Sequence, residues 1–427
     1  MGLEGRRALF ISYNGMLDPL GQTQVLPYLR SLALLGVKFT LLSFERDKAF
    51  VGDGPEKTRK LRSELLEHGI DWRWLRYHQS PSLPATTYDV FAGIRFAKAL
   101  VQEKQIELVH ARSHIPATIA LALKRRFGVK MIFDLRGLMA DEYVDAEHWP
   151  KNGLRYRITK LAERRVLRNT DAVVTLTERI WPIIKEWDGL RGRDVHHSVI
   201  PCCVDLNKFS FSAHDRELRR AELGLGQQFT LVYSGSIDGW YLTEAMVDFF
   251  AVCAKHKPDA HLLWLTNGSH DRIRQLMLSR NVEPSKFSVR SVTADLVPSY
   301  LSAADAGMAF IKPCFSKLAS SPTKNGEYLA CGLPLVINSG IGDSDALIEK
   351  HKTGALLRDF KEEDYVAAVT KLNEIALEPD LRNRIRSIAA ELFDLETVGM
   401  RRYAELYERV FDCQQFRPRA KYDEQST

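Results

Sequence analysis

Short apolar runs alternate with amphipathic segments along the first half of the chain. The apolar runs have the length and the Val, Ile, Leu and Phe content of buried strands. They are RALFISY (7–13), KFTLLSF (38–44), IDWRWLRY (70–77), IELVHAR (106–112), VKMIFDLRG (129–137) and DAVVTLTE (171–178). The segments between them, such as TQVLPYLRSLALLG (23–36), repeat apolar residues every three or four positions, which predicts helices. Alternating strands and helices predict a parallel sheet that is covered on both faces.

The pattern breaks near residues 200–209 and then starts again. The next apolar runs are FTLVYSGSI (229–237), AHLLWLTNG (260–268) and AGMAFIKP (306–313). A chain of 427 residues is too long for one ordinary core. We therefore predict an α/β protein with two doubly wound domains, residues 1–203 and 204–394. Ligands of such sheets bind beyond the carboxyl ends of the strands, here in the cleft between the domains. Residues 414–427 are expected to be a disordered tail.

The stretch SSPTKNGEYLACGLPLV (320–336) reads as a helix start, a helix and a turn into a strand. Ser321 suits the N-cap and Pro322 suits the first helical position. Lys324 then falls in the first turn, where the helix dipole disfavours a cation. A bound diphosphate would make this lysine favourable, because the free amides of residues 323–325 would face the same anion. The stretch therefore predicts an anion site.

Glu327 lies three residues after Lys324, on the same face of the predicted helix. Its carboxylate could accept hydrogen bonds from two vicinal hydroxyls, as on a ribose. The alternative is that Lys324 is solvated and Glu327 is its surface partner, and such pairs are common and weak.

Two loops carry small or polar residues at strand ends. In VYSGSIDGWY (232–241), Gly235, Ser236 and Gly239 would let backbone amides approach a phosphate, although glycine and serine also end many ordinary strands. The loop SYNGMLDPLGQTQ (12–24) is long for a connection between a strand and a helix, which favours a functional loop. It offers Asn14, Gly15, Gly21 and Gln22 to the cleft.

Charged side chains follow two more strands, in VHARSHIP (109–116) and FDLRGLMADEYVD (133–145). Any one of them is most simply a surface or capping residue. Together, at the carboxyl edge of one sheet, they are better candidates for a site. The set is His110, Arg112, His114, Asp134, Arg136, Asp141 and Glu142.

The net charge of +6 and the pI near 8.9 indicate a mildly basic protein. This charge is too small and too dispersed to indicate nucleic acid, but it suits an anionic substrate or membrane surface. The basic stretches LKRRFG (123–128) and RYRITKLAERRVLRN (155–169) could supply a membrane contact, although an exposed helix has the same composition. We expect peripheral contact with an anionic membrane at most.

The six cysteines are scattered and form no CxxC pair, so neither a zinc site nor a disulfide framework is indicated. A reducing cytoplasm is the natural compartment for such a chain. No apolar run approaches the ~20 residues of a membrane span.

Three segments resemble a known family. IPCCVDLNKF (200–209), GEYLACGLPLVINSGIGD (326–343) and ELYERVF (405–411) are similar to the linker, the donor-site signature and the closing helix of retaining glycosyltransferases of the GT-B fold, family 4 type. The resemblance covers nearly the whole chain. It implies an acceptor-side Rossmann-like domain over 1–203, a nucleotide-sugar-binding Rossmann-like domain over 204–394, and a helix over 395–413 that crosses back to the first domain.

The chain also departs from the family pattern. The family often carries Glu-x7-Glu, whose second Glu binds the donor ribose. Glu327 matches that second position, but the first falls at Ala319. Ser236 stands where the first phosphate loop usually has an arginine, so Lys324 would supply the cation from the helix itself. Arg136 stands about where a histidine often ends its strand, which makes it a candidate for orienting the reacting sugar.

The resemblance, read with these departures, implies three sets of residues. The catalytic set is Lys324, Arg136 and Asp134. The donor-binding set is Gly235, Ser236, Gly239, Ser321, Thr323, Lys324, Asn325, Glu327 and Val292, the last from the segment expected to contact the base. The acceptor-side set is Asn14, Gly15, Gly21, Gln22, Arg112, Asp141 and Glu142. Because protein cations can neutralise the leaving diphosphate, no metal and no cofactor are expected.

The expected function is transfer of a hexose from a nucleotide diphosphate sugar, UDP- or GDP-linked, to an acceptor hydroxyl with retention of configuration. The acceptor would be a glycan, a lipid-linked sugar or a small molecule, in polysaccharide, glycolipid or glycoconjugate biosynthesis in the cytoplasm or at the inner membrane face. Other GT-B activities, such as sugar-nucleotide epimerisation or phosphorolysis, and a non-catalytic sugar-nucleotide-binding subunit remain open. A Rossmann dehydrogenase is disfavoured, because no G-x-G-x-x-G follows the first strand.

Overall fold

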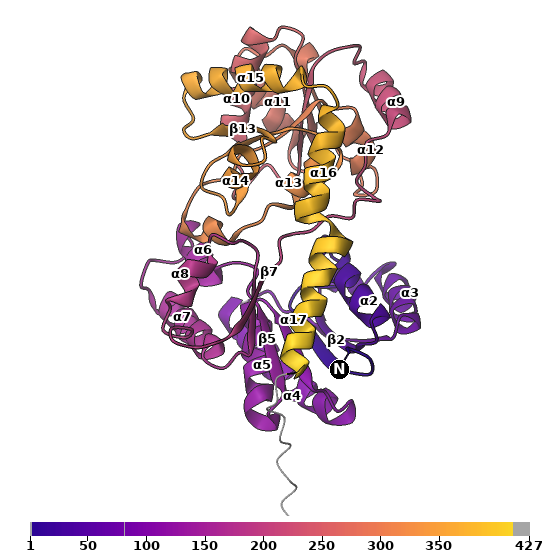
Figure 1. The fold of residues 1–427 in the computed structure, drawn as a ribbon, viewed down its shortest axis with the longest axis vertical. Helices are drawn as coiled ribbons and strands as arrows, with labels where there is room; N and C mark the ends of the chain where they lie inside the picture. Colours follow the sequence, from indigo (N-terminus) through magenta and orange to yellow (C-terminus); the bar gives the residue numbers. More distant parts are fainter. Residues whose placement is uncertain (1, 81, 413–427) are drawn as a thin grey trace, which may run out of the picture.

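The computed structural model describes residues 2–80 and 82–412, so the predicted tail over 414–427 lies outside the described residues. Two parallel sheets occupy consecutive halves of the chain and form two lobes (Figure 1). This confirms the predicted fold class of two doubly wound, Rossmann-like domains.

The first sheet has seven strands and the second has six in the part of the chain that the structure describes. The strands of the first sheet are β1 (Arg7–Ser12), β2 (Lys38–Glu45), β3 (Ile70–Arg76), β4 (Leu108–Arg112), β5 (Lys130–Asp134), β6 (Ala172–Thr175) and β7 (His196–Val199). The strands of the second sheet are β8 (Thr230–Ser234), β9 (His261–Leu265), β10 (Phe287–Arg290), β11 (Ala306–Ala309), β12 (Leu335–Asn338) and β13 (Gly354–Leu357).

The strand order is β3-β2-β1-β4-β5-β6-β7 in the first sheet and β10-β9-β8-β11-β12-β13 in the second. All these strands are parallel, and the order in which successive strands are added reverses once in each sheet, between β1 and β4 and between β8 and β11. Ligands of open parallel sheets bind at this switch point, beyond the carboxyl ends of the strands. The loops after β1 and β8, which the sequence singled out, lie at these two positions.

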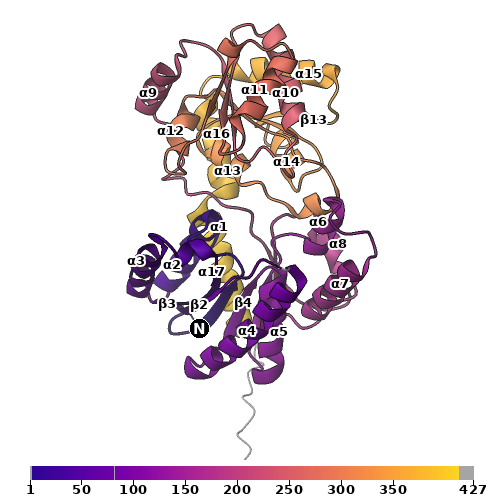
Figure 2. The same cartoon turned by 180° about the vertical axis from the view of Figure 1, so that it is seen from behind.

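The helices of the first domain cover both faces of its sheet (Figures 1 and 2). They are α1 (Pro19–Gln24), α2 (Leu26–Leu34), α3 (Gly54–Glu67), α4 (Ser82–Glu103), α5 (His114–Phe127), α6 (Met139–Asp145), α7 (Leu154–Leu167) and α8 (Trp181–Lys185), with a 3₁₀ turn η1 (Asp47–Ala49).

The second domain begins with α9 (Ala213–Leu223) and is built in the same way. Its other helices are α10 (Thr243–His256), α11 (His270–Ser279), α12 (Val297–Ser302), α13 (Thr323–Ala330), α14 (Ser344–Glu349), α15 (Glu362–Ala376) and α16 (Leu381–Phe393), with 3₁₀ turns η2 (Pro284–Lys286) and η3 (Phe315–Ala319). Within the described residues of the two domains, no helix is both long and apolar enough to cross a membrane.

The chain crosses back to the first domain after α16. Val204 and Asp394 form a bridge beside the connection between the domains, and a π-helical turn, η4 (Leu395–Met400), leads into α17 (Arg401–Asp412). Figure 1 shows α16 on the upper lobe and α17 continuing down the lower one. The apolar face of α17 joins the core on one face of the first sheet, with Leu406 and Tyr407 fully buried.

Polar contacts fix α17 on the first sheet. The Tyr403 hydroxyl donates to Asp134 Oδ2 at 2.9 Å, and Lys130 Nζ donates to the Val410 carbonyl oxygen at 2.7 Å. His110 Nδ1 lies 2.7 Å from the Tyr407 hydroxyl. Because these groups are buried, each hydrogen bond replaces water that the group lost on folding.

The predicted helix over 23–36 is wrong in detail. The backbone of Val25 (φ −130°, ψ −64°) separates α1 from α2, and Pro27 follows in the first turn of α2. Pro27 cannot donate within a helix and its ring clashes with the carbonyl group four residues earlier, so α1 cannot continue through it, whereas proline is accepted in the first turn of a new helix. Gly21 and Gln22, which were expected in a loop, therefore lie within α1.

We predict that Tyr403→Phe destabilises the protein. It leaves the buried Asp134 carboxylate without its closest donor, and loss of a hydrogen bond to a charged group costs about 1.5–3 kcal/mol. Thermal and urea unfolding should show the loss. Glu408→Gln, on the exposed face of α17, is the control and should leave the midpoint unchanged. Equal midpoints for Tyr403→Phe and the control would contradict the assigned contact.

Candidate active site

Lys324 is the buried cation of the candidate site. Its side chain is 6% exposed at the start of α13. The ammonium nitrogen lies 4.0 Å from the ring centre of Tyr241 and 5.4 Å from that of Tyr233, and cation–π attraction holds it there. No carboxylate among the described residues lies within ion-pair distance of it. The lysine is therefore neither a solvated surface residue nor half of a surface pair with Glu327.

The loop after β8 meets this lysine directly. A Cβ atom on Gly235 would lie 2.7 Å from Lys324 Nζ, so only glycine allows this approach. Gly235 (φ +140°) and Gly239 (φ +74°) both have backbone conformations that favour glycine. The carbonyl oxygen of Ser236, between them, accepts a hydrogen bond from the Tyr233 hydroxyl. The prediction that the glycine loop and the helix start face each other agrees with this contact.

Tyr328 fixes α13 against the same loop. Its hydroxyl accepts a hydrogen bond from the Ser234 amide at 2.7 Å. The ring packs on Gly307 of β11, where a Cβ atom would lie 2.3 Å from the ring. The Lys-x-x-Glu-Tyr spacing puts Lys324 and Tyr328 one helical turn apart, so that both side chains contact the loop after β8.

The expected cap of this helix is wrong. The helix begins at Thr323 with Pro322 at the N-cap, and no side chain caps it. The Ser321 hydroxyl instead accepts from the amide of Cys202 at 3.2 Å. The Asn325 amide already donates to the Pro322 carbonyl oxygen at 3.2 Å. Of the three amides expected to bind an anion, those of Thr323 and Lys324 remain for it.

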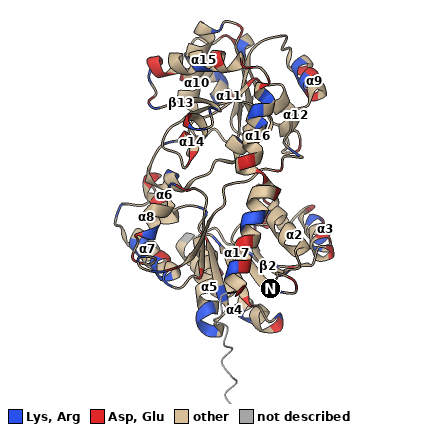
Figure 3. Ribbon diagram, in the orientation of Figure 1, with Lys and Arg blue, Asp and Glu red and all other residues tan. Residues whose placement is uncertain are grey.

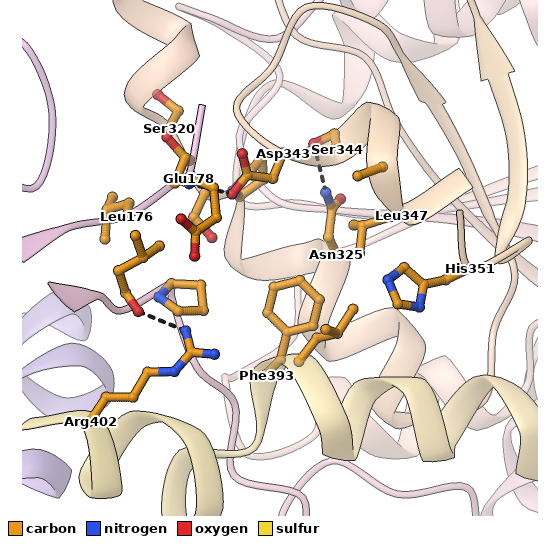
Figure 4. A pocket seen from close by; sticks show the side chains of 17 residues that line it. Leu176, Glu178, Ser320, Asn325, Asp343, Ser344, Leu347, His351, Phe393 and Arg402 are labelled. Carbon is orange, nitrogen blue, oxygen red and sulfur yellow. Dashed lines mark hydrogen bonds between the residues drawn. The ribbon is translucent and has the colours of Figure 1, made fainter. Parts of the chain in front are cut away.

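Ser321 and Asn325 face a different space. Their side chains line a pocket of about 260 Å³ between the domains, with Thr177 from the first domain and Phe393 from α16 (Figure 4). Asn325 donates to the Ser344 hydroxyl at 3.2 Å. Their membership of the donor-binding set stays a prediction, and the geometry gives it no direct support.

Glu327 is half-buried one turn after Lys324. Burial raises the pKa of its carboxyl, while the positive charges of Lys324 and Lys208 act in the opposite direction by less. No described residue hydrogen-bonds or pairs with this carboxylate. It is thus an acceptor without a protein donor, as the ribose-binding prediction requires.

A second buried lysine, which sequence reasoning missed, joins the two domains. Lys317 of η3 is 6% exposed, and its ammonium nitrogen lies 3.8 Å from the Trp240 ring centre and 3.1 Å from Glu142 Oε1 of α6. Asp145 at the end of α6 accepts from the Ser316 amide at 2.8 Å. The predicted acceptor-side residue Glu142 therefore meets the second domain here. No spacing rule marks Lys317, because its partners are remote in sequence.

A buried charged cluster lies at the carboxyl ends of β4 and β5. Arg136 Nη1 is 3.8 Å from Asp134 Oδ1, and His110 Nε2 is 3.5 Å from Asp134 Oδ2. Burial alone would raise the pKa of Asp134, but Arg136 and His110 hold it below its usual value. Burial lowers the pKa of His110 against the pull of Asp134. Asp134 is therefore an enclosed carboxylate, held by three elements.

Arg136 has a left-handed backbone (φ +54°), which costs a non-glycine residue on the order of 1–2 kcal/mol. Its guanidinium lies 3.4 Å from Gln24 Oε1 and 3.5 Å from Cys202 Sγ. Cys202 in turn donates its amide to Ser321. Strained residues of this kind are held in place by their surroundings. Arg136 thereby links the first sheet to the segment that precedes α13.

The remaining predicted residues are distributed along the edge of the first sheet. Asn14 accepts from Arg112 Nη1 at 3.2 Å, and a Cβ atom on Gly15 would lie 2.6 Å from the Glu45 carboxylate. Gln22 donates to the Met16 carbonyl oxygen at 2.6 Å. These contacts bring Asn14 and Arg112 together at the ends of the adjacent strands β1 and β4.

Asp141 and Val292 have partners of other kinds. Asp141 accepts from the Tyr156 hydroxyl and from Lys160 Nζ, each at 3.1 Å, so it belongs to a network with α7. Val292 follows β10 and packs on an apolar cluster of the second domain. Their proposed roles stay predictions.

The acidic pair Asp343 and Asp345 was passed over in the sequence. Asp343 accepts from the amides of Glu178 and Arg179, and Asp345 from Ser339 and Gly340. Within residues 2–80 and 82–412, no group of three His, Cys, Asp or Glu side chains is arranged to hold a metal ion.

The sequence and the fold of this chain are similar to those of known glycosyltransferases. Residues 21–203 match the family model of the glycosyl transferase 4-like domain. A comparison with curated proteins gives no match. Among solved structures, a glycosyltransferase from Rickettsia africae has a TM-score of 0.70 at 14% identity, over 96% of this chain and 99% of that one. Anabaena HepE in complex with UDP has a TM-score of 0.69 at 17% identity, over 94% and 100%. WaaG, a glycosyltransferase involved in lipopolysaccharide biosynthesis, has a TM-score of 0.65 at 16% identity, over 93% and 99%.

Two doubly wound domains, with a phosphate-type loop and a helix start at the switch point of the second, define the GT-B class. The chain has the fold of GT-B glycosyltransferase structures, and residues 21–203 match the glycosyl transferase 4-like domain. The resemblance stated from the sequence is thereby confirmed.

We predict that Glu327→Gln stabilises the free protein and weakens donor binding. With a raised pKa, the ionised carboxylate is less favourable folded than unfolded. The penalty is absent below the unfolded pKa of about 4.3, grows as the pH rises and is complete above the folded pKa. The variant should therefore gain more in melting temperature at pH 7 than at pH 4.

Donor binding should fall by about 1.5–3 kcal/mol, the value of a hydrogen bond to a charged group. Glu363→Gln, which is exposed on α15, is the control and should change neither property. A melting-temperature gain that did not depend on pH would contradict the assigned cause.

Proposed function

We propose that this glycosyltransferase moves a hexose from a nucleotide diphosphate sugar to an acceptor hydroxyl with retention of the anomeric configuration and without a metal ion. The observation that carries the proposal is the buried ammonium of Lys324. It lies against Gly235 at a helix start, and no described carboxylate lies within ion-pair distance of it. A buried cation in such a place is stabilised by an anionic ligand.

The chemistry follows from where charge develops. As the C1–oxygen bond to the diphosphate breaks, negative charge grows on the leaving phosphate. Lys324 and the free amides of Thr323 and Lys324 are positioned to bind that charge more strongly than they bind the ground state. The acceptor oxygen bonds to C1 on the same face, and its proton passes to the departing phosphate oxygen. Atoms and charge balance without an added base.

The buried cluster of the first domain has a supporting role in this proposal. Asp134 is enclosed and bound to Tyr403, so we assign it to holding Arg136 rather than to accepting the acceptor proton. Arg136 would keep the first sheet and the segment before α13 in register while the sugar binds. Glu142 and Arg112 stay acceptor-side candidates.

Ala319 removes the carboxylate that the family often uses for the sugar. Lys317 lies two residues before Ala319 in the chain, and its ammonium lies on the ring of Trp240. An aromatic face and a cation beside the phosphate loop suit a sugar ring. The proposal therefore gives sugar recognition to this pair.

The donor is proposed to be UDP- or GDP-linked. Anabaena HepE, which shares the fold, has been solved with UDP-glucose, at 17% identity and a TM-score of 0.66. We further propose that the reaction belongs to polysaccharide, glycolipid or glycoconjugate biosynthesis in the cytoplasm. The arginines of α7 and the basic last turn of α5 support peripheral contact with an anionic membrane (Figure 3).

A thermal-shift panel of UDP-, GDP-, ADP- and TDP-sugars should identify the donor. A sugar nucleotide at 100 times its Kd stabilises the folded protein by about 2.7 kcal/mol. We expect one nucleotide to shift the melting temperature clearly more than the others do, and EDTA to leave that shift unchanged. A panel without any shift would refute the donor assignment, and a shift abolished by EDTA would refute metal independence.

We predict that Lys324→Ala lowers kcat by on the order of 10²–10³-fold, the usual effect of removing one charge-stabilising donor. Folding should survive, because the ammonium contacts only aromatic rings and a glycine loop. Lys350→Ala, exposed in the same domain, is the matched control. The measurement is donor turnover with and without acceptor, and NMR of the product anomer tests retention.

Three results would favour other functions. Near-normal turnover by Lys324→Ala would remove the central assignment. Epimerisation of the donor without acceptor would indicate a sugar-nucleotide epimerase. Donor binding with no hydrolysis or transfer would indicate a non-catalytic subunit.

A further inference from the structure

A second large cavity lies inside the first domain, apart from the Lys324 site. It has a volume of about 760 Å³ and is enclosed by α4, α5, α6 and α7, beside the ends of β1 and β5. This volume is in the range of small-molecule sites, about 300–1,000 Å³. The wall is largely apolar, with Val90, Ile115, Met139 and Trp149 among its residues.

The mouth of the cavity is apolar as well. Leu83 of α4 is 54% exposed, and Leu154 and Ile158 of α7 are 74% and 53% exposed, and all three line the cavity. Tyr88 and Phe91 add exposed apolar area on α4. A contiguous exposed apolar area around a hollow is a feature of binding sites rather than of ordinary surface.

Two groups at this cavity lack partners. His114 is 6% exposed and lines the cavity, and Glu163 holds its Nε2 at 3.0 Å. Its Nδ1 is buried and has no hydrogen-bond partner in the described part of the chain. Arg155 also lines the cavity and pairs with no described carboxylate. The two acidic groups nearby, Glu163 and Asp141, are already paired with Lys160.

The cavity adjoins the junction of the two domains. Met139 and Tyr143 of α6 form part of its wall, with Tyr143 stacked on Trp149 at 4.3 Å. Glu142 and Asp145 of the same short helix bind Lys317 and Ser316 of the second domain. Helix α6 thus lies between the cavity and the place where η3 of the second domain meets the first domain.

We propose that this cavity binds the apolar chain of an anionic amphiphile, which is the acceptor of the transfer reaction. Arg155 at the mouth binds the anionic group, and the reacting hydroxyl passes α6 toward the Lys324 site. The acceptor role rests on the proposed function, whereas the binding site stands on the cavity alone. An arginine without a described carboxylate partner, beside an apolar hollow, favours an anionic amphiphile over a second copy of this chain, whose own α7 face is basic.

The probe is dodecyl phosphate below its micelle concentration, with ethyl phosphate and inorganic phosphate as short-chain references, measured by titration calorimetry on the full chain. We expect saturable binding of dodecyl phosphate only. Ala162→Trp, which fills the cavity from α7, should weaken it by about tenfold or more, since several methylene groups lose their place.

Two matched pairs of surface variants test the proposal even if Ala162→Trp folds poorly. Ile158→Asn at the mouth should weaken dodecyl phosphate binding about threefold or more, whereas Leu161→Asn, on the same helix but outside the lining, should not. Arg155→Gln should weaken it, and Arg157→Gln, exposed but outside the lining, should not.

Several outcomes would overturn the proposal. They are absence of dodecyl phosphate binding, equal binding of inorganic phosphate, and equal effects within either matched pair. Vesicle binding or self-association lost equally in Ile158→Asn and Leu161→Asn would show a membrane-facing or copy-to-copy surface instead.

The two proposals can fail separately. Lys324→Ala should abolish the thermal shift by the donor while leaving dodecyl phosphate binding intact, and Ala162→Trp should do the reverse. Amphiphile binding without any donor shift would leave the cavity assignment standing and remove the proposed function.

Discussion

The ammonium of Lys324, buried without a protein anion, is the constraint that shapes the second domain around it. Two aromatic rings hold the charge in place, and Gly235 leaves room for it beside the loop. The tyrosine one turn later fastens the helix to the same loop, and Gly307 makes room for that ring. Together they keep a charge out of water until an anion arrives, which is how preorganised sites gain strength.

Much of the fold could be predicted because it depends on local pattern. Parallel strands buried on both faces give continuous apolar runs, and both sheets were found from them. The errors arose where backbone geometry overrides pattern. The break at Val25 follows from Pro27, and the start of α13 at Thr323 follows from the bond that Ser321 makes with Cys202 instead of capping. That contact joins residues 119 positions apart, so no local rule anticipates it.

The candidate site divides in the same way. Lys324, Glu327 and the glycine loop could be found because their spacing within short segments carries the chemistry. Lys317 could not, because its meaning comes from Glu142 on the other domain and from the Trp240 ring. The apolar cavity was also invisible, since its wall comes from four helices whose apolar residues look like ordinary core positions. Where a site forms from segments that meet only after folding, the spacing of residues in the sequence does not predict it.

The last helix, α17, supplies part of the core of the first domain, and this sets the order in which the protein can be completed during synthesis. Residues such as Phe10, Tyr28 and Leu29 share one apolar cluster with Leu406 and Tyr407. While the ribosome makes the second domain, that face of the first sheet lacks the part of its cover that α17 supplies, and Asp134 lacks its tyrosine donor. The first domain is synthesised first, but its core is completed last. Until α17 is made, the apolar residues that it covers stay exposed, and exposed apolar surface of this kind favours aggregation.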